Sequence, residues 1–324
     1  MAGDAVRRVG RGWAPVHHGE ILQGAFPHEG RLVRALVTLP CTLHTTRATF
    51  TPEPGGRLTV SPPCRTKALR AARLALKACA GTDDDAGGHL TLTGDVPPGR
   101  GFGSSTSDVL AAVNAVQDAL EVSLPTEETA RMAVRAETAS DALMFPDTTV
   151  LFAQREGEVL EDFGHALPTL RVLGFGSRPD LAGRGVDTLT LPPPHYTPSE
   201  IRTFTRLRSL LREAVATKDP ALVGEVATAS TLLNQRHLPV PALDTLLAIA
   251  EKTDALGLQT AHSGDIAGLL YDPGTDAPIR EASDLLHALG LHEQWRFTTP
   301  GLPRGLPPER RCRRSPWQGA AAST

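Results

Sequence analysis

The first part of the chain carries strand-like and helix-like patterns of apolar and polar residues. Leu32 to Leu39 and Leu43 to Phe50 are rich in residues that favour strands, and they predict short strands separated by Pro40. Cys64 to Ala80 has apolar residues at helical spacing and predicts a helix. His89 to Val96 alternates between apolar and polar residues, which is typical of a half-buried strand. The start of the chain is therefore expected to hold short strands and turns, followed by a helix and a strand.

The same kinds of pattern continue to about residue 298. Further helices are predicted at about Ser107–Leu120, Thr126–Ala139 (from a capping-box-like Thr-Glu-Glu-Thr), Ser199–Thr217, Pro220–Asn234, Pro241–Leu256 and Pro278–Leu289. Further strands are predicted at Thr149–Ala153 and Val159–Phe163, a hairpin turning at Glu156-Gly157, and at Leu170–Phe175, Leu258–Ala261, Ile266–Tyr271 and His292–Thr298. This order indicates an α+β fold rather than a strict βαβ alternation.

Two similarly sized halves follow from this pattern, with a boundary near residues 163–169. We expect an N-terminal domain at residues 1–165, a C-terminal domain at residues 166–300 and a disordered tail at residues 301–324. The tail carries an arginine cluster between Arg310 and Arg314. Such a cluster could touch a phosphate backbone, but a solvated terminus is the favoured interpretation.

The composition excludes several classes of protein. Hydrophobic residues make up 40% and charged residues 21% of the 324 residues, and the net charge of −3 provides no field that would recruit nucleic acid or an anionic membrane. No apolar run approaches the ~18 residues of a membrane span. Met1 to Arg11 is polar and basic, so no secretory signal is expected. The four cysteines form no C-x-x-C pair and fit a reducing compartment. We therefore expect a cytoplasmic monomer or homodimer with no nucleic-acid or membrane partner.

The segment Pro97 to Asp108 (PPGRGFGSSTSD) lies between a predicted strand and a predicted helix. Its three glycines in five residues allow positive φ angles and a close approach of the backbone to a ligand. Ser104 or Ser105 is the expected N-cap of the helix. Unpaired N–H groups and the positive end of the helix dipole favour an anion such as phosphate, and the hydroxyls can bind phosphate or Mg²⁺. The segment therefore predicts a phosphate site.

Other glycine-loop motifs do not match this segment. No Lys follows the glycines as in a Walker loop, and the sixth position of a dinucleotide fingerprint is occupied by Ser104 or Thr106. The G-x-S-x-G elbow of hydrolases is absent as well. The alternative without function is a glycine-rich turn with an N-capping serine. The flanking strand, the flanking helix and Pro97-Pro98 favour the ligand.

Three segments together resemble a known family. Pro97 to Ser107 matches the motif P-x-x-x-G-[LFM]-[GA]-S-S-[AST]-[AS], which binds phosphate in the GHMP kinases, named for galactokinase, homoserine kinase, mevalonate kinase and phosphomevalonate kinase. Ala14 to Gly24 (APVHHGEILQG) resembles their first motif, which helps to form the substrate and nucleotide pocket. Ala261 to Leu269 (AHSGDIAGL) resembles their third, a glycine turn that closes over the phosphates. The resemblance implies a two-domain GHMP kinase fold, an N-terminal phosphate-loop domain with a C-terminal ferredoxin-like domain, and the cofactors ATP and Mg²⁺.

Within the superfamily, the chain most resembles L-threonine kinases of the cobalamin-synthesis type. Gly19 to Gly24 reads G-E-I-L-Q-G where they have G-E-L-V-Q-G, and Ser104 to Val109 (SSTSDV) matches their S-S-T-A-D-[IV]. Asp141 to Phe145 is similar to their D-x-x-M-F segment. Asp265 stands where their third motif has a threonine.

The resemblance implies roles for individual residues. Asp141 would be the catalytic residue, and Ser105 and Glu137 would hold Mg²⁺ between the phosphates. The predicted nucleotide-binding residues are Pro98, Gly99, Arg100, Gly101, Phe102, Gly103, Ser104, Ser105, Thr106, Ser263 and Gly264. The predicted substrate-binding residues are Glu20, Gln23, Gly24, His262 and Asn234.

Several of these residues have an alternative interpretation. Glu137 could be a solvated charge at a helix end, and Asp141 a turn residue. Glu20 could bind the ammonium of an amino acid, because a buried carboxylate needs a partner. Asn234 could bind a substrate carboxylate or cap its helix, and His262 is expected to help shape its turn.

Other polar residues are assigned no ligand. His17 and His18 point apart on a strand, so a surface or hydrogen-bonding role is favoured over a two-histidine metal site. Asp147 is expected to be a turn residue, and Asp83 to Asp85 a solvated loop.

The sequence as a whole predicts an ATP-dependent small-molecule kinase. The expected acceptor is the side-chain hydroxyl of L-threonine or a similar hydroxy amino acid. The alternatives are a kinase of homoserine or another small alcohol in a specialised biosynthetic pathway, and a GHMP-fold protein that binds nucleotide or metabolite without catalysis.

Overall fold

A computed structural model describes residues 8–53, 55–80, 87–178, 194–261 and 264–299. The strands are β1 (Gly10–His28), β2 (Arg31–Pro52), β3 (Leu58–Ser61), β4 (Gly88–Gly94), β5 (Val150–Ala153), β6 (Glu158–Asp162), β7 (Arg171–Gly176), β8 (Gly257–Thr260), β9 (Ile266–Tyr271) and β10 (Gln294–Thr298). The helices are α1 (Thr66–Ala80), α2 (Ser104–Leu120), α3 (Thr126–Glu137), α4 (Pro198–Thr217), α5 (Pro220–Asn234), α6 (Leu243–Lys252) and α7 (Ala277–Ala288). These elements form the mixed α+β fold that the sequence predicts.

One curled sheet runs through both halves of the chain. Its main path has the order β10-β7-β9-β8-β1-β2-β4-β3, and β5 joins it by pairing with β2 and β6. The long antiparallel pair β1 and β2 forms its spine, and β1 meets β8 where Glu20 pairs with Thr260. The register of β1 on β2 shifts between Pro15 and Val16 and on both sides of Glu20. These bulges bend the strands beside the first sequence motif, because each extra residue interrupts the ladder and increases the local twist.

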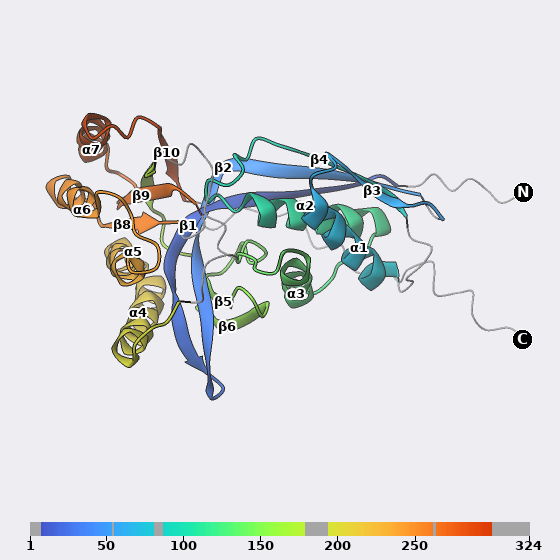
Figure 1. Cartoon of the computed structure of the whole chain (residues 1–324), viewed down its shortest axis with the longest axis horizontal. Coiled ribbons are helices and arrows are strands. Elements are labelled where there is room, and N and C mark those ends of the chain that lie inside the picture. The colour runs from blue at the N-terminus through green and yellow to red at the C-terminus, as the bar shows by residue number, and fades with distance from the viewer. Residues whose placement is uncertain (1–7, 54, 81–86, 179–193, 262–263, 300–324) are drawn as a thin grey trace, which may run out of the picture.

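The helices gather at the two ends of the molecule (Figure 1). The helices α1, α2 and α3 lie at one end, and α4 to α7 lie at the other, with β1 and β2 reaching between them. Helix α2 approaches β1 very closely, because a Cβ atom at Gly12 would lie 2.1 Å from the carbonyl oxygen of Ala111. The N-terminus of α2 is thereby held near the point where β1 bends.

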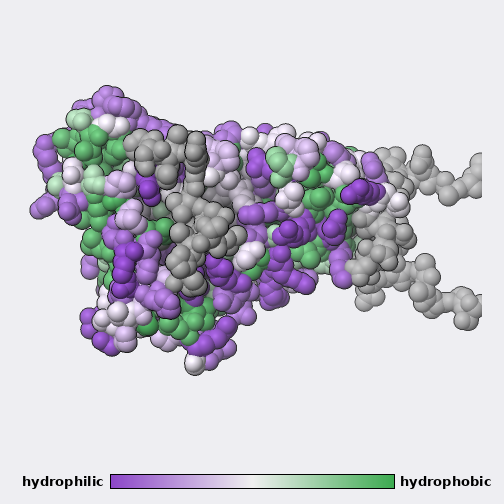
Figure 2. Space-filling view, viewed as in Figure 1, coloured by the Kyte–Doolittle hydropathy of each residue, from purple (hydrophilic) through white to green (hydrophobic). Residues whose placement is uncertain are grey.

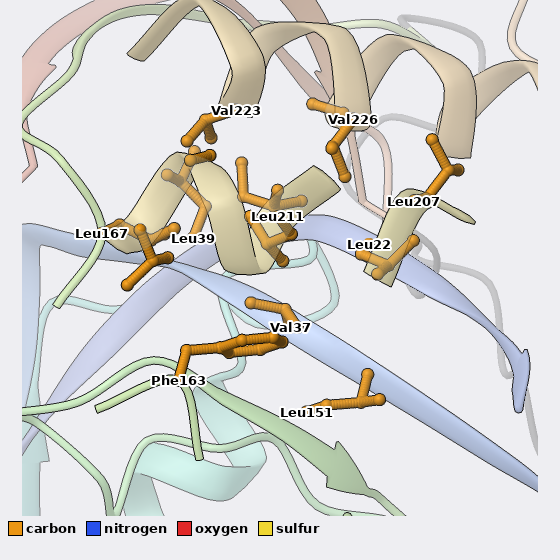
Figure 3. Packing of buried hydrophobic residues seen from close by; sticks show 14 of the residues in the cluster. Leu22, Val37, Leu39, Leu151, Phe163, Leu167, Leu207, Leu211, Val223 and Val226 are labelled. Carbon is orange, nitrogen blue, oxygen red and sulfur yellow. The ribbon is translucent and has the colours of Figure 1, made fainter. Parts of the chain in front are cut away.

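The largest apolar core lies between the long strands and the helices of the second half. Figure 3 shows Leu211 of α4 and Val223 of α5 above the β1–β2 ribbon, with Leu151 and Phe163 below it. Burial of each such side chain contributes about 1.5–3 kcal/mol relative to its exposure to water. The core therefore ties the second half of the chain to the strands of the first.

Most predicted elements agree with the structure, and the first two strands show the main difference. We predicted strands broken at Pro40, whereas β2 continues through it for 22 residues. Pro40 pairs with His17 next to a register shift, a position where a missing ladder hydrogen bond is tolerated. The short strand β3 was not predicted at all.

Two predicted helix caps are wrong. Gly103, with a left-handed φ of 68°, is the N-cap of α2 in place of Ser104 or Ser105, and no side chain caps this helix. The Thr-Glu-Glu-Thr capping box is absent, since Pro125 is the N-cap of α3 and no side chain caps it either.

The Asp83 to Asp85 run and the arginines between Arg310 and Arg314 lie outside the described residues.

In the described part of the chain, we find no helix that combines the length and apolar character needed to cross a bilayer. On the face shown in Figure 2, hydrophilic residues are spread over the surface with apolar areas between them.

Candidate active site

The glycine loop lies between β4 and α2, as predicted, and ends against the first motif. Gly99, Gly101 and Gly103 all have left-handed φ angles of 73°, 98° and 68°. A Cβ atom at Gly103 would lie 2.2 Å from the ring of His17 and 3.2 Å from Asp141 Oδ2. The His17 backbone N–H donates to the Phe102 carbonyl oxygen at 3.2 Å. The loop, β1 and the turn after α3 therefore meet at one point.

An ion pair between His17 and Asp141 occupies that point. The distance from His17 Nε2 to Asp141 Oδ2 is 2.9 Å, and His17 Nδ1 lies 3.3 Å from the Gly19 carbonyl oxygen. The His17 side chain is completely buried, whereas 21% of the Asp141 side chain is exposed. Asp141 is the partner that solvent and a ligand can reach.

The pKa values of this pair favour the charged forms. Burial alone would lower the pKa of His17, but attraction and hydrogen bonding to Asp141, with a smaller contribution from Glu20, raise it to about 9. Burial alone would raise the pKa of Asp141, but the charge and hydrogen bond of His17 and the hydrogen bond of Thr106 lower it. At neutral pH the pair is therefore an imidazolium beside a carboxylate.

The Thr106 hydroxyl joins Asp141 to a second acid. Thr106 Oγ1 lies 2.8 Å from Glu137 Oε1 and 3.1 Å from Asp141 Oδ2, and it accepts the Asp141 backbone N–H at 3.3 Å. Glu137 is the last residue of α3 and only 3% exposed, so it is not the solvated charge of the alternative interpretation. Burial raises the pKa of Glu137 to about 7, although hydrogen bonding by Ser105 and Thr106 opposes this rise. Both acids face the first turn of α2.

Residues fit for a Mg²⁺ ion are present here. The Ser105 hydroxyl is buried with no hydrogen-bond partner of standard geometry, yet it lies close enough to Glu137 to lower the pKa of that carboxyl. A hydroxyl and a carboxylate beside a phosphate site are the oxygen ligands that Mg²⁺ prefers. The ligand atoms of His17, Glu20 and Asp141 also lie within 4.8 Å of one another. A protonated imidazole cannot ligate, so Ser105 and Glu137 fit the ion better.

Glu20 brings a third acid to the same point. It is 3% exposed, pairs with Thr38 on β2 and with Thr260 on β8, and adds to the field that raises the pKa of His17. Two strands and a bulge therefore place a buried carboxyl beside Asp141. The first motif and the turn after α3 therefore meet in the structure.

A cavity of about 90 Å³ is lined by chain neighbours of this group, although His17, Glu20 and Asp141 do not themselves line it. Its lining includes Val16, which precedes His17, and Ala142, which follows Asp141. Thr38, Cys41, Thr149 and Leu167 line it as well, and no charged side chain does. The cavity is suited to a small, mostly apolar group.

His18 belongs to a different environment. Its Nδ1 lies 2.9 Å from Gln259 Oε1, and its Nε2 lies 3.0 Å from Trp295 Nε1. Because an indole N–H can only donate, His18 Nε2 accepts this bond and His18 Nδ1 donates to Gln259. Burial lowers the pKa of His18 to about 4. The ring also packs against Phe102 and Phe297, with centroids 5.7 and 5.1 Å away.

Some predicted site residues are engaged elsewhere. Asn234 donates to the carbonyl oxygens of Gln23 and Ser230 at 2.9 Å and accepts the Tyr196 hydroxyl at 2.8 Å. A Cβ atom at Gly24 would lie 2.4 Å from the ring of Phe204. These contacts show how α4 and α5 hold β1, and they leave substrate binding by Gln23, Gly24 and Asn234 as a prediction.

The nucleotide-binding predictions divide in the same way. Gly99 is exposed, and Gly103 and Ser104 are partly exposed, so they remain at the loop surface. Gly101 is buried against Ala261, Phe102 packs in the His18 cluster and Thr106 bridges two acids. The Arg100 side chain turns away to Asp265 and Glu293, so its guanidinium is not directed at a phosphate. Gly264 lies against Arg100, and Pro98 lies in the loop. His262 and Ser263 lie outside the described residues.

The sequence analysis did not assign His17 to the site, although His17 contacts Asp141, Gly19 and Phe102. His17 has a hydrogen-bonding role, as one interpretation held, but neither histidine is at the surface. The signal available in the sequence was a histidine directly before Gly-Glu in the first motif. Its partner Asp141 is 124 positions away.

Comparisons with known proteins show which family the chain resembles. Residues 66–145 match the GHMP kinases N terminal domain. The L-threonine kinase of Salmonella typhimurium is 30% identical over 184 residues, which are 57% of this chain and 60% of that enzyme. The homoserine kinase of Listeria innocua is 30% identical over 203 residues, which are 60% of this chain and 67% of that enzyme. The match to the L-threonine kinase thus spans less than two thirds of its length.

Solved structures show the same fold over nearly the whole chain. Homoserine kinase from Cytophaga hutchinsonii superimposes with a TM-score of 0.62 at 15% identity, covering 93% of this chain and 97% of that one. Mevalonate kinase from methicillin-resistant Staphylococcus aureus gives a TM-score of 0.57 at 15% identity, covering 90% and 98%. The α+β fold thus brings a glycine loop at a helix N-terminus next to buried acids, and the homoserine kinase relative is matched over two thirds of its length. The chain belongs to the GHMP kinase family.

Proposed function

We propose that this protein is an ATP-dependent kinase that transfers the γ-phosphate to the side-chain hydroxyl of L-threonine or a similar hydroxy amino acid. The observation that supports it most is the convergence of His17, Glu20 and Asp141, within 4.8 Å of one another, in front of the uncapped N-terminus of α2. A phosphate site and an acidic group for the acceptor then lie side by side. Phosphoryl transfer needs this juxtaposition more than any covalent chemistry.

The N-terminus of α2 supports nucleotide binding. No side chain caps its first N–H groups, and Gly103 precedes them in a left-handed conformation. Backbone N–H groups at a helix start bind phosphate oxygens through hydrogen bonds and through the helix dipole. The nucleotide phosphates would lie along Gly99, Gly101, Gly103 and Ser104.

Asp141 would orient the acceptor hydroxyl. Its carboxylate accepts a hydrogen bond from that hydroxyl and takes up the proton as the oxygen bonds to phosphorus and the bond to the leaving ADP breaks. The lowered pKa of Asp141 makes it a weak base, so proton transfer would come late, in keeping with a loose transition state. His17 keeps Asp141 ionised and in place.

Ser105 and Glu137 would hold Mg²⁺ against the phosphates. The bound ion would neutralise phosphate charge during transfer. Glu137 must be ionised to act as a ligand, and its pKa of about 7 places that change in the neutral range.

The charges of the site favour an amino-acid acceptor. The group of His17, Glu20, Asp141 and Glu137 holds one cationic side chain, His17, and three carboxyls. An ammonium group is attracted to such a site, and Glu20 would bind it. The small apolar cavity beside Val16 and Ala142 has room for little more than a methyl-bearing carbon chain.

An ADP-release assay with Mg-ATP and a panel of L-threonine, L-serine, homoserine and mevalonate tests the proposal. We expect kcat/KM for L-threonine to exceed that for homoserine at least tenfold, about 1.4 kcal/mol in transition-state binding. The deaminated analogue 3-hydroxybutanoate should be a poor acceptor, and Glu20→Gln should raise the KM for L-threonine while it leaves the KM for ATP unchanged.

The other outcomes separate the alternatives. A preference for homoserine would support that substrate, for which relatives of 30% identity exist. Tight ATP binding with no ADP release on any acceptor would refute the proposed kinase activity. The protein would then be one that binds nucleotide without catalysis.

A further inference from the structure

Three charged residues join the glycine loop to the second half of the chain. Arg100 Nε donates to Asp265 Oδ1 at 2.6 Å, and Arg100 Nη1 and Nη2 donate to the two carboxylate oxygens of Glu293 at 2.8 and 2.7 Å. The Arg100 and Asp265 side chains are 12% and 3% exposed, whereas Glu293 is 60% exposed. We call Arg100, Asp265 and Glu293 the clasp. It has a buried arm and an outer, bidentate arm.

The backbones of the two glycine turns touch beneath the clasp. The Asp265 N–H donates to the Arg100 carbonyl oxygen at 3.1 Å. A Cβ atom at Gly264 would lie 2.1 Å from that same oxygen, and one at Gly101 would lie 2.7 Å from Ala261 Cβ. No side chain fits at Gly264 or Gly101 without movement of the backbone. The loop of the first half is thus seated directly on the turn of the second.

The second half is shaped to receive the arginine. A Cβ atom at Gly176 on β7 would lie 2.9 Å from Arg100 Nη2 and 3.2 Å from Glu293 Oε2. Ser177 donates to the Asp265 carbonyl oxygen from its N–H at 2.6 Å and from its hydroxyl at 2.8 Å. Asp265 is therefore fixed from the backbone side as well as by the arginine.

A loop with three positive-φ glycines loses much conformational freedom when it binds a ligand, and this loss weakens binding unless the loop is ordered beforehand. We propose that the clasp orders the glycine loop before nucleotide binds, so that Arg100 acts as a positioning residue for ATP without contacting it. This inference rests on the proposed nucleotide site. According to this inference, the affinity for ATP depends partly on Asp265 and Glu293. These residues lie 165 and 193 positions after Arg100 in the sequence.

Glu293→Gln tests the clasp without leaving a buried charge unpaired. It weakens the outer arm and retains the pair of Arg100 with Asp265. We expect the Kd for Mg-ATP to rise roughly fivefold, as for loss of a well-formed ion pair near the surface. Arg100→Lys should act in the same direction, because lysine keeps the charge beside Asp265 and loses the bidentate fork. Asp276→Asn is the matched control, since Asp276 is also 60% exposed and pairs with an arginine, Arg171 of β7, away from the glycine loop.

Two readouts distinguish positioning from general support of the fold. In Glu293→Gln, KM for ATP should rise while kcat and the KM for the acceptor stay within twofold of wild type. Amide hydrogen exchange of residues 99–103, measured without nucleotide, should be roughly fivefold faster in Glu293→Gln and unchanged in Asp276→Asn.

The possible failures are separable. Wild-type protein that binds Mg-ATP, with both clasp variants within twofold of its Kd, would overturn the inference and leave the proposed function standing. Wild-type protein with no affinity for Mg-ATP would refute the proposed function and this inference with it. Equal losses in KM for ATP and for the acceptor would show that the clasp supports the whole site and not the nucleotide.

Discussion

His17 and His18 are adjacent on β1 and equally buried, but they face two different regions of the molecule. His17 points to Asp141 in the acidic group, where its pKa is raised to about 9, and His18 points to Gln259 and Trp295 in an aromatic cluster, where its pKa is lowered to about 4. Burial lowers the pKa of both rings. The carboxylate of Asp141 overcomes that effect at His17, whereas His18 faces Gln259 and Trp295 and, among the described residues, no carboxylate.

The difference shows how one strand serves two purposes. Successive side chains of a strand point to opposite faces, so two neighbouring residues supply a charged ring to the acidic group and a neutral ring to the aromatic cluster. Identical residue types therefore carry no common function here, and burial by itself does not predict protonation.

Asp141→Asn should have the largest effect, because it removes the anion that makes His17 different from His18. We expect kcat to fall at least ~10²-fold. The pKa of His17, followed by NMR titration, should also fall below 9 towards that of a buried neutral ring. Asp147→Asn, at an exposed position six residues on, is the control and should keep wild-type kcat. Near-wild-type turnover of Asp141→Asn would make Asp141 a structural residue.

His17→Gln should reduce kcat by about 10- to 100-fold, the effect of losing a charged hydrogen bond worth about 1.5–3 kcal/mol. It also tests stability at alkaline pH. A histidine with a raised pKa stabilises the fold fully below its unfolded pKa of 6.5, and this stabilisation is lost as pH rises through about 9.

Urea unfolding between pH 6.5 and 9.5 measures that loss. The wild type should lose up to about 3 kcal/mol across this range, because the pKa of His17 rises from 6.5 to about 9 on folding, and His17→Gln should lose much less. Parallel curves for the two proteins would contradict an ion pair with Asp141.

His18→Phe should affect stability and spare catalysis. It leaves the Trp295 N–H without its acceptor, and a buried unpaired donor costs about 1–3 kcal/mol. In the wild type, a histidine with a lowered pKa stabilises the fold above pH 6.5, and this stabilisation is lost as pH falls through about 4. His18→Phe should lack that acid-side loss and keep kcat within threefold. A kcat reduced as far as in His17→Gln would remove the contrast between the two rings.

The smallest expected effect concerns Glu137, which belongs to the acidic group around His17. Raising the pH from 6 to 8 should tighten Mg²⁺ binding roughly tenfold, because the carboxyl ionises near its pKa of about 7. Glu137→Gln should bind Mg²⁺ weakly and with little dependence on pH. Titration calorimetry in the presence of a non-hydrolysable ATP analogue measures both, and equal slopes in the two proteins would disprove the assignment of Glu137.

The parts that the sequence predicted well are those governed by local chemistry. Helix α5 agrees with its prediction because Asp219 caps it and Pro220 starts it, signals that need no tertiary partner. The position of the glycine loop between strand and helix follows from its own glycines. The long strand β2 was missed because Pro40 breaks a strand in isolation and is tolerated beside a bulge, which only the pairing with β1 creates.

The connections within the site could not be predicted in this way. Nothing local pairs His17 with Asp141, Thr106 with Glu137 or Arg100 with Glu293, since their partners lie 124, 31 and 193 positions away. The family resemblance supplied Asp141, Glu137 and Glu20 as candidates. The resemblance also implied that Arg100 binds the nucleotide. In the structure its side chain pairs with the carboxylates of Asp265 and Glu293.

The pairing of Glu20 with Thr260 also affects how the chain is made. Residue 20 leaves the ribosome 240 residues before its partner on β8, an interval of roughly 12 to 48 s at ordinary rates of synthesis. Throughout that interval β1 can pair with β2, but its edge at Glu20 lacks the contact with β8. A nascent chain of about 250 residues would therefore present an unpaired strand edge next to three acidic side chains. Pausing or truncation in that interval is where we expect the protein to be most prone to aggregation and most dependent on chaperones.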